Sequence, residues 1–350
     1  MTKILLTGAA GWLGSRLLET LCAPTPTSGW PEAQSAAIRA LVLPGQDVSR
    51  LEARCPHAEF VAGDLRNPAD CSRFCDGAQG AVLFHAAGMI HPRRVREFYE
   101  VNRDGTILLL ETAIREGVKR AVIVSSNSPC GCNPHPDHLF DEFSPYRPYL
   151  NYGRSKMQME LAVLERAAHI ETVIIRAPWF YGPNQPARQT LFFKMVRDGK
   201  APIVGDGKNL RSMSYLDNLC QGLLLAARSP EAAGQVYWMA DRRPYAMNEI
   251  IDTIERLLES EFGQTCAHRR FHLPGFASGL AYRADQALQA LGLYHQKIHV
   301  LSEMNKSIAC SVRKAEKELG YQPSIELEEG MRRSLKWCFE TVGGLDSPSP

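Results

Sequence analysis

The chain has 350 residues, a formal net charge of +2 and 45% apolar residues, which is enough to build a large α/β domain with a smaller one attached. Because the charge is nearly balanced and no basic cluster stands out, neither nucleic acid nor an anionic membrane is expected as a partner. No apolar run reaches the length of a transmembrane helix or forms a signal-peptide core, so the expected location is the cytoplasm. The ten cysteines lack the paired spacing of a structural zinc site, so we expect reduced thiols and no metal.

The start of the chain has the order of elements that a dinucleotide site needs. Residues 3–7 read as a buried strand and 15–21 as a helix, with three glycines in the turn between them. Gly8 permits a tight turn, Gly11 lets a pyrophosphate approach backbone amides, and Gly14 lets the helix pack close to the sheet. The spacing is G-x-x-G-x-x-G, so the match to the commoner G-x-G-x-x-G is partial. The expected cofactor contacts in this turn are Gly8, Gly11, Trp12, Leu13 and Gly14.

The second strand, expected over 38–43 after a long loop, bears on the choice between NAD and NADP. An acidic residue at its end would bind the adenosine ribose, whereas an arginine there would favour the 2′-phosphate of NADP. Residues 43–47 offer neither at the strand end, and Arg39 within the strand is a weak argument for NADP. We therefore expect NAD and leave NADP open.

Two further strand ends carry residues that suit a cofactor. One strand ends just before Asp64, whose carboxylate can reach an adenine amino group or cap the following helix, and both interpretations stay open. The strand over 81–85 ends in the small residues 86–88, which leave room for a ligand to lie across the strand ends.

The remaining elements of this half alternate between helix and strand. Such alternation specifies a parallel sheet with helices on both faces, that is, an α/β fold of the doubly wound Rossmann type. Its ligands bind at the carboxyl ends of the strands, where Ser125, Ser126 and Asn127 end one strand. The expected elements are a helix over 95–116, a strand over 120–125, a proline-rich loop over 130–149, a helix over 152–168 and a strand over 171–176.

Tyr152 and Lys156 are about one helical turn apart and so share a helix face. Using a tyrosine as a base at neutral pH requires lowering its pKa by roughly three units, or about 4 kcal/mol, and a nearby cation supplies much of this. With a positively charged nicotinamide ring above the site, Tyr152 would take the proton of a substrate alcohol while the ring takes its hydride. Taken alone, such a pair is more often an ordinary exposed helical pair.

Together these motifs resemble the extended short-chain dehydrogenase/reductases, the NAD-dependent epimerase/dehydratase family that includes UDP-glucose 4-epimerase and the 3β-hydroxysteroid dehydrogenase branch. Each motif is weak alone, but their occurrence in the family's order over nearly the whole chain makes chance improbable. They are Thr7-Gly8-x-x-Gly11-x-x-Gly14, Asp64-Leu65, Ala86-Ala87-Gly88, Asn102 with Gly105-Thr106, Ser125-Ser126, Tyr152-x-x-x-Lys156 and Arg176-Ala177-Pro178-x-x-Tyr181-Gly182-Pro183.

The resemblance implies a role for each catalytic residue. Tyr152 would be the acid and base, Lys156 the group that lowers its pKa and binds the nicotinamide ribose, and Ser126 the hydroxyl that orients the substrate oxygen. The spacing to the following glycine selects Ser126 over Ser125, although Cys130 stands where the family has a tyrosine. The further cofactor contacts that the resemblance implies are Asp64, Leu65, Ala86, Ala87, Gly88 and Asn102.

The C-terminal half also resembles the family and carries the implied substrate contacts. Arg211 sits where nucleotide-sugar enzymes place an arginine against the substrate diphosphate, since a guanidinium pairs well with phosphate oxygens. Arg283 is a second candidate with a weaker match, and Asn127 beside Ser126 is a third. The expected organisation is a Rossmann domain over 1–178, a smaller α/β substrate-binding domain over 179–342 with the chain crossing between the two, and a disordered tail over 343–350.

The leading hypothesis for the function is an NAD-dependent enzyme of nucleotide-sugar metabolism, a 4-epimerase or a 4-ketoreductase. Dehydration is disfavoured, because Asn127 and Ser128 follow Ser126 where dehydratases add acidic residues. The first alternative is a 3β-hydroxysteroid dehydrogenase-like or dihydroflavonol reductase-like enzyme that acts on an apolar alcohol or ketone. Its support is that two stretches of the sequence, residues 39–45 and 98–102, resemble the 3β-hydroxysteroid dehydrogenase branch more than the nucleotide-sugar enzymes.

A third hypothesis comes from a different class, a non-catalytic dinucleotide-binding sensor or scaffold. The intact Ser126, Tyr152 and Lys156 argue against it. Members of the family commonly pair through their two long helices, so we expect a homodimer formed by 95–116 and 152–168.

Overall fold

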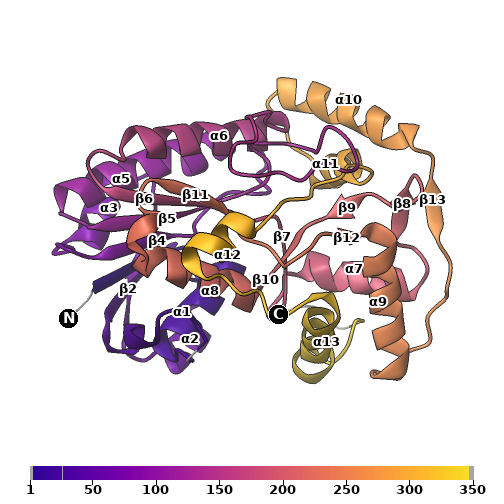
Figure 1. Ribbon diagram of the computed structural model, residues 1–350, viewed down its shortest axis with the longest axis horizontal. Coiled ribbons are helices and arrows are strands. Elements are labelled where there is room, and N and C mark those ends of the chain that lie inside the picture. Colours follow the sequence, from indigo (N-terminus) through magenta and orange to yellow (C-terminus); the bar gives the residue numbers. More distant parts are fainter. Residues whose placement is uncertain (1–2, 26, 347–350) are drawn as a thin grey trace.

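The computed structural model describes residues 3–25 and 27–346, and its centre is a parallel sheet of seven strands (Figure 1). The strands lie in the order β3-β2-β1-β4-β5-β6-β11, and every pairing is parallel. The order reverses between β1 and β4, where open sheets of this kind bind their ligands. The expected fold class is thus confirmed. The strands are β1 (Lys3–Thr7), β2 (Ala37–Val42), β3 (Ala58–Ala62), β4 (Val82–His85), β5 (Arg120–Ser125), β6 (Glu171–Arg176) and β11 (Gln235–Trp238).

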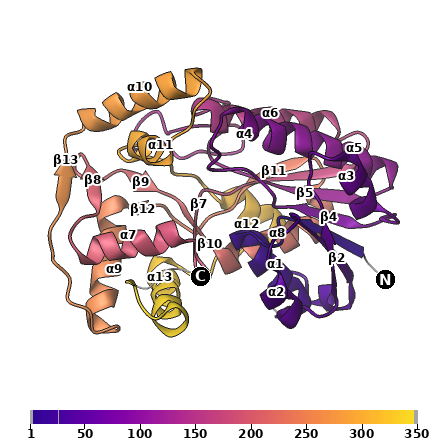
Figure 2. The ribbon, with the colours of Figure 1, turned by 180° about the vertical axis from the view of Figure 1, so that it is seen from behind.

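Helices cover both faces of this sheet, because its inner strands are apolar on both sides. On β1, Leu5 belongs to the core under α3, α5 and α6, whereas Ile4 and Leu6 belong to the core under α1, α8 and α12. Figures 1 and 2 show the two helix layers with the sheet between them. No helix within the described residues is long and apolar enough to cross a membrane. The helices are α1 (Trp12–Cys22), α2 (Ser49–Arg54), α3 (Pro68–Cys75), α5 (Thr106–Arg115), α6 (Leu150–Glu165), α8 (Leu216–Arg228) and α12 (Arg313–Leu319), with short turns η1 (Pro31–Ser35) and η3 (Pro230–Ala232).

The long helix expected over 95–116 is present but irregular. It runs through α4 (Arg96–Phe98), a π-helical turn η2 (Tyr99–Gly105) and then α5. A π turn holds an extra residue and occurs frequently at functional sites. This one carries Asn102, whose side chain is buried.

The smaller lobe has a core of its own, in which α7, α9 and α13 pack around Phe193, Ile254 and Met331. Its strands have only two or three residues each and form separate two-stranded sheets. The chain crosses between the lobes, because α8, β11 and α12 return to the large sheet after the first strands of the small lobe (Figure 1). The boundary at residue 178 stays a prediction. The remaining elements are β7 (Trp179–Tyr181), α7 (Ala187–Arg197), β8 (Pro202–Val204), β9 (Leu210–Arg211), β10 (Met213–Tyr215), β12 (Tyr245–Ala246), α9 (Met247–Ser260), β13 (Phe271–Leu273), α10 (Phe276–Ala290), α11 (Gln296–Glu303), α13 (Leu327–Trp337) and η4 (Cys338–Val342).

The C-terminal segment corrects one expectation. Leu345 is 4% exposed and packs in the core of the smaller lobe. Asp346 forms ion pairs with Lys194 (2.6 Å) and Arg197 (2.8 Å) on α7. The disordered tail expected from residue 343 is therefore wrong for 343–346, and the rest of that tail, 347–350, lies outside the described residues.

A buried ion pair fixes α6 against the sheet. The Glu160 carboxylate on α6 accepts hydrogen bonds from Arg176 on β6 (2.7 Å), Ser125 on β5 (2.5 Å) and Tyr146 in the preceding loop (2.8 Å). The side chains of Glu160 and Arg176 are 0% and 3% exposed. Charges buried this deeply are tolerated only when they are well paired, so the position of α6 depends on this contact.

Replacing Glu160 with Gln leaves the Arg176 guanidinium buried without a counter-charge. We expect the free energy of unfolding to fall by about 3 kcal/mol, as is usual when one partner of a buried pair is removed. Urea unfolding followed by circular dichroism measures this loss. The matched control is Glu165→Gln at an exposed position of the same helix, which should change the value by less than about 0.5 kcal/mol. Equal losses for the two variants would show that the pair does not hold α6.

Candidate functional site

The glycine turn after β1 forms a cradle in which side chains have no room. Gly8 has φ +74°, and a Cβ there would lie 2.6 Å from the backbone nitrogen of Ala87. A Cβ on Gly14 would lie 1.9 Å from the carbonyl oxygen of Gly8. Glycine is therefore required where β1, α1 and the segment after β4 approach one another.

The N-terminus of α1 in this cradle suits an anion. Its N-cap is Gly11, and no side-chain hydrogen bond caps the helix. Uncapped N–H groups and the helix dipole favour a pyrophosphate at this position. Trp12 and Leu13 present their backbone here, because the Leu13 side chain is buried in the core and the Trp12 indole donates to the Pro183 carbonyl oxygen (2.8 Å). The residues present thus fit the dinucleotide that the sequence predicts.

Two side chains considered for the adenosine end are engaged with the protein. The Arg66 guanidinium hydrogen-bonds the Asp64 carboxylate (2.5 and 3.0 Å) and holds the pKa of that carboxyl below its usual range. Asp64 does not cap the following helix, whose N-cap is Asn67. Arg39 lies in the first half of β2 and pairs with Glu59 (2.7 Å), away from the ligand-binding end of the strand. The argument for NADP from Arg39 is therefore removed.

A directed chain of hydrogen bonds lies behind the segment that follows β4. The Ala87 N–H donates to Thr7 Oγ1 (3.3 Å), which donates to His85 Nδ1 (2.7 Å). His85 Nε2 donates to Thr106 Oγ1 (2.8 Å), which donates to the Asn102 carbonyl oxygen (2.8 Å). Because Thr106 uses its proton on the backbone, the imidazole proton is assigned to Nε2. Burial lowers the pKa of His85 to about 3, so the ring is neutral at physiological pH.

Asn102, expected as a cofactor contact, supports the loop after β4 from behind. Its side chain accepts from the Met89 N–H (2.7 Å) and donates to the Met89 carbonyl (2.9 Å) and to Ser155 Oγ on α6 (3.2 Å). Leu65, expected in the same role, is buried against Gly105 of the π turn. Both residues therefore support the site from within the protein, and their contact with the cofactor stays a prediction. The small residues of the loop remain at the sheet edge, with Ala86 and Ala87 half-buried and Gly88 exposed.

Ser126, Tyr152 and Lys156 gather at the carboxyl end of β5. Ser126 directly follows the strand, and its hydroxyl hydrogen-bonds the phenol of Tyr152 in the first turn of α6. Lys156 is buried, and its Nζ donates to the Val124 carbonyl oxygen (2.9 Å). Ser125 takes no part in this group, because its hydroxyl is bound to the buried ion pair. The structure therefore places Ser126, and not Ser125, beside the tyrosine.

In this environment the Tyr152 phenol keeps its proton at neutral pH. Burial raises its pKa to about 12, and the hydrogen bond from Ser126 opposes that rise. Burial also lowers the pKa of Lys156 to about 8, so its ammonium is mostly charged at pH 7. Ser126 Oγ also lies 3.3 Å from Asn127 Oδ1, which places the expected substrate contact Asn127 beside the same group.

Three residues from the C-terminal part lie on the side of the site toward α10 and α11, and no motif in the sequence marks them. Tyr294 packs on Phe98 (ring centroids 5.2 Å apart), which packs on Tyr152 (5.5 Å). The charge of Glu303 adds to the rise of the Tyr152 pKa that burial causes. The Glu303 carboxylate lies 3.7 Å from His299 Nε2, and His299 is in turn paired with a buried aspartate of α10.

The two arginines expected to bind substrate lie in different places. Arg211 on β9 is half-buried, and its Nε has no hydrogen-bond partner among the described residues. The backbone of Arg211 pairs with that of Ile308, five residues after Glu303, so β9 runs beside the segment that follows α11. An unpaired guanidinium N–H of this kind is available to an anion. Arg283 is not brought to the site, because it is exposed on the side of α10 opposite to the buried Asp285.

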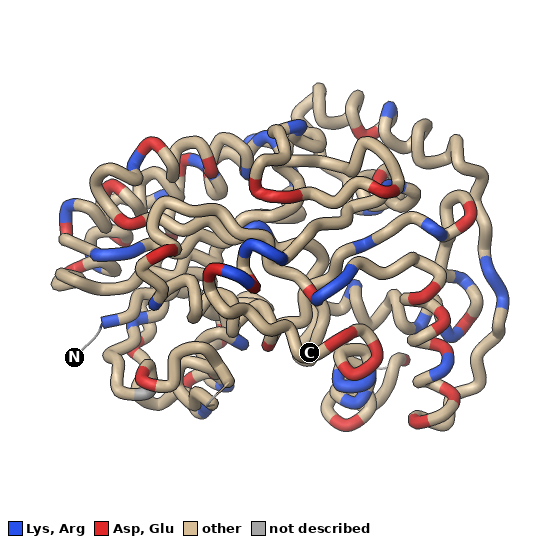
Figure 3. Tube along the Cα trace, viewed as in Figure 1, with Lys and Arg blue, Asp and Glu red and all other residues tan. Residues whose placement is uncertain are grey.

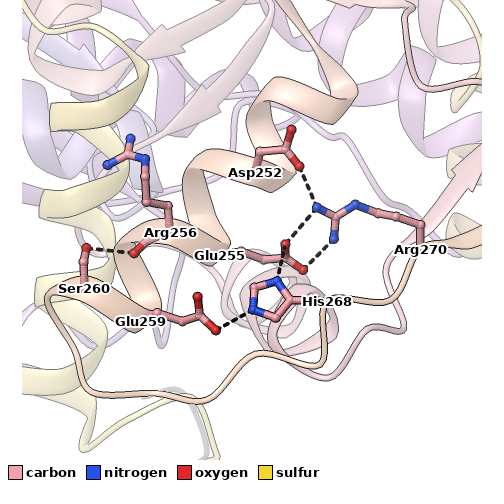
Figure 4. A pocket seen from close by; sticks show the side chains of 7 residues that line it. All are labelled: Asp252, Glu255, Arg256, Glu259, Ser260, His268 and Arg270. Carbon is pink, nitrogen blue, oxygen red and sulfur yellow. Dashed lines mark hydrogen bonds and ion pairs between the residues drawn. The ribbon is translucent and has the colours of Figure 1, made fainter.

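A surface hollow of about 550 Å³ in the smaller lobe is a separate feature (Figure 4). It lies between α9 and the segment that leads into β13. Arg270 pairs there with Glu255 (2.5 Å) and Asp252 (2.6 Å), and His268 pairs with Glu259 (2.7 Å). Because these charged side chains are paired with one another, the hollow offers no free reactive group of this set. We therefore expect the chemistry at the carboxyl edge of the large sheet.

This fold and this site define the class of protein as an oxidoreductase that binds a dinucleotide. The order of the sheet and the glycine turn before α1 match the extended short-chain dehydrogenase/reductases. Residues 4–240 match the NAD dependent epimerase/dehydratase family, and the chain belongs to that family. The expected family, the enzyme class and NAD as the cofactor are thereby confirmed.

Similar proteins cover nearly the whole chain. The uncharacterised protein y4nL of Sinorhizobium fredii (strain NBRC 101917 / NGR234) is 54% identical over 340 residues, which are 96% of this chain and 95% of that protein. The 3beta-hydroxysteroid-dehydrogenase/decarboxylase isoform 1 of Arabidopsis thaliana is 28% identical over 303 residues, 81% of this chain and 67% of that protein. The structure of UDP-glucose 4-epimerase with UDP-glucose from Thermotoga maritima shares the fold, with a TM-score of 0.76 and 20% identity over 97% of this chain and all of that one.

Replacing Gly8 with Ala tests the cradle. The added Cβ would displace the segment at Ala87, and we expect the NAD affinity to fall about tenfold or more, or about 1.4 kcal/mol. The matched control is Gly80→Ala, which has a similar φ of +72° but no atom within 4 Å of its Cβ. Both variants have the cost of alanine at positive φ, about 1 kcal/mol or more in stability. Isothermal titration with NAD separates them, and equal affinities would reject the cradle as the pyrophosphate site.

Proposed function

We propose that the chain oxidises and reduces a sugar hydroxyl of a nucleotide sugar, as a 4-epimerase or a 4-ketoreductase, with Tyr152 as the acid and base. The observation that carries the proposal is the meeting of Ser126, Tyr152 and Lys156 at the carboxyl end of β5. The glycine cradle after β1 lies on the same edge of the sheet, with only β4 between the two strands. The residues proposed for proton transfer therefore lie close to the glycine turn proposed for dinucleotide binding.

Each residue of the group has a step in the reaction. In the direction of oxidation, the phenolate form of Tyr152 takes the proton of the substrate hydroxyl while Ser126 donates a hydrogen bond to the substrate oxygen. Bound NAD supplies the hydride acceptor, and its oxidised nicotinamide ring adds the positive charge that favours the phenolate. In the direction of reduction, Tyr152 returns the proton to the carbonyl oxygen, and its pKa of about 12 keeps it protonated for that step. Lys156, whose pKa burial lowers to about 8, is mostly charged at pH 7, and its Nζ is held at the end of β5.

Arg211 supports a nucleotide sugar as the substrate. A half-buried guanidinium with an unpaired Nε suits the diphosphate of such a molecule. Glu303 ends α11, five residues before the backbone that pairs with Arg211, and its carboxylate would accept hydrogen bonds from sugar hydroxyls. The similarity in fold to a UDP-glucose 4-epimerase agrees with this choice.

A second candidate is a dehydrogenase or reductase that acts on an apolar alcohol or ketone. The observation in its favour is the aromatic wall at Tyr152, in which Phe98 contacts both Tyr152 and Tyr294. The Arabidopsis relative, a 3beta-hydroxysteroid-dehydrogenase/decarboxylase by name, points the same way.

The assembly and the location complete the proposal. Two chains would pair through α5 and α6, which lie side by side on one face of the sheet. The homodimer and the cytoplasmic location both stay predictions.

Tyr152→Phe keeps the ring and removes the proton-transferring hydroxyl. We expect turnover of alcohols or ketones to fall about a thousandfold, because general acid-base catalysis typically contributes on that order, with NAD affinity unchanged. The matched control is Tyr237→Phe, which removes a hydroxyl bonded to Glu318 on the far side of the sheet. Hydride transfer followed by absorbance measures both. Full activity of Tyr152→Phe would refute the proposed acid and base. A wild type that binds NAD but turns over no alcohol or ketone would support a non-catalytic sensor.

Arg211→Ala separates the two substrate classes. With a nucleotide sugar we expect KM to rise at least about tenfold, since a hydrogen bond to a charged group is worth about 1.5–3 kcal/mol. The matched control, Lys208→Ala, removes an exposed cation from the same segment and should leave KM unchanged. Steady-state kinetics on UDP-sugars measures the difference. An unchanged KM for Arg211→Ala would favour the apolar substrate.

A further inference from the structure

Helix α10 has a largely polar buried face and an apolar exposed face, the reverse of an ordinary surface helix. Its buried residues are Ser278, Ala281, Asp285 and Gln289. At roughly 100° per residue the opposite side carries a second set, which we call the α10 face. It consists of Phe276, Leu280, Ala284, Ala287 and Leu291. Its large members Phe276, Leu280 and Leu291 are 75%, 67% and 77% exposed.

Hydrogen bonds on the buried side hold the helix in this orientation. Ser278 Oγ donates to the Ser302 carbonyl oxygen (2.6 Å), and Asp285 pairs with His299 Nδ1 (2.7 Å). Gln289 donates to Asp285 (2.9 Å) and also accepts hydrogen bonds from α6. Rotating the helix to bury the α10 face would break these contacts and leave buried polar groups unpaired, which is costly. The outward apolar face is therefore built into the fold.

The surroundings of the α10 face are basic. Between residues 264 and 302 the only acidic residue is Asp285, which is 0% exposed. The charged residues of α10 are Arg283 and Asp285, and Figure 3 draws most of this helix in the colour of residues other than Lys, Arg, Asp and Glu. The backbone of residues 93–95 pairs with that of residues 292–294, so the loop that carries Arg93 and Arg94 lies beside the C-terminal end of α10. The exposed cations here, none of which forms an ion pair within the described residues, are Arg93, Arg94, Arg283 and Lys297.

We propose that the α10 face docks on an anionic lipid surface. An exposed apolar stripe flanked by cations without local acidic partners is the pattern of a helix that lies in the interface of a membrane. Each cation near an anionic leaflet adds to the attraction. A second copy of the chain fits less well, because a twofold contact through α10 would bring Arg283 and Lys297 of the two copies together, and residues 264–302 offer no exposed carboxylate to offset them.

Docking in this way brings the active site close to the lipid. A short chain of contacts connects α10 to the site. Asp285 on the buried side of α10 pairs with His299, and His299 Nε2 lies 3.7 Å from the carboxylate of Glu303. A substrate with an apolar part would then enter from the membrane side. The net charge of +2 gave no hint of this, since it averages the acidic and basic residues of the whole chain. The docking does not depend on which substrate the site accepts.

Cosedimentation of the full-length protein with vesicles tests the proposal. The vesicles are phosphatidylcholine alone and an equal mixture of phosphatidylcholine and phosphatidylglycerol. We expect binding to the mixed vesicles, weaker binding at high salt, and a loss of about tenfold or more in the partition coefficient for Phe276→Ser/Leu280→Ser/Leu291→Ser. Arg283→Glu should weaken binding severalfold. The matched control is Leu43→Ser, which removes a 51% exposed leucine directly after β2, outside α10 and its basic surroundings.

Three outcomes would overturn the proposal. They are no binding to the mixed vesicles, equal binding of Arg283→Glu and wild type, and a dimer seen by light scattering that the triple serine variant abolishes, since a second copy would then cover the face. Circular dichroism establishes that each variant is folded. Tyr152→Phe should bind vesicles as the wild type does, so a failure of the proposed catalysis leaves this test intact.

Discussion

The buried carboxylate of Glu160 is the contact on which the site depends. It binds Arg176 on β6 and Ser125 on β5, and Lys156 precedes it by four residues on α6. The same contact therefore sets the distance of α6 from two strands and, through Ser125, the place where Ser126 leaves the sheet. Because a buried charge without its partner costs several kcal/mol, this arrangement resists small shifts. The acid-base group needs such rigidity, since proton transfer works only over hydrogen-bond distances.

The parts of the fold that the sequence predicts are those with a local pattern. β1, β5 and β6 begin and end where expected, because strands buried on both faces appear as unbroken apolar runs. The glycine turn could be recognised because the close approach of Gly8 and Gly14 to other backbone excludes side chains. The short strands of the smaller lobe have two or three residues each, too few to show a period.

The residues that were missed act through long-range contacts. Glu303 and His299 lie about 150 residues beyond Tyr152 in the sequence, and nothing near them marks them as part of a site. Asn102 and Leu65 support the loop after β4 and the π turn through contacts distant in the sequence, and the cofactor contact that the family motif implies for them stays a prediction. Arg283 was expected at the site by its position in the chain, yet the rotation of α10 turns it outward.

That rotation has a physical cause that the apolar pattern cannot reveal. Reading α10 by hydrophobicity alone would bury Phe276 and Leu280 and expose Asp285. The structure does the opposite, because Asp285 has a fixed partner in His299 that satisfies its charge, and Phe276 and Leu280 stay 75% and 67% exposed. Exposing two large apolar side chains costs a few kcal/mol in water, at roughly 25 cal/mol per Å². A helix that keeps this cost in its folded state gains from any apolar surface that covers it, and the unpaired cations around it select a surface of negative charge.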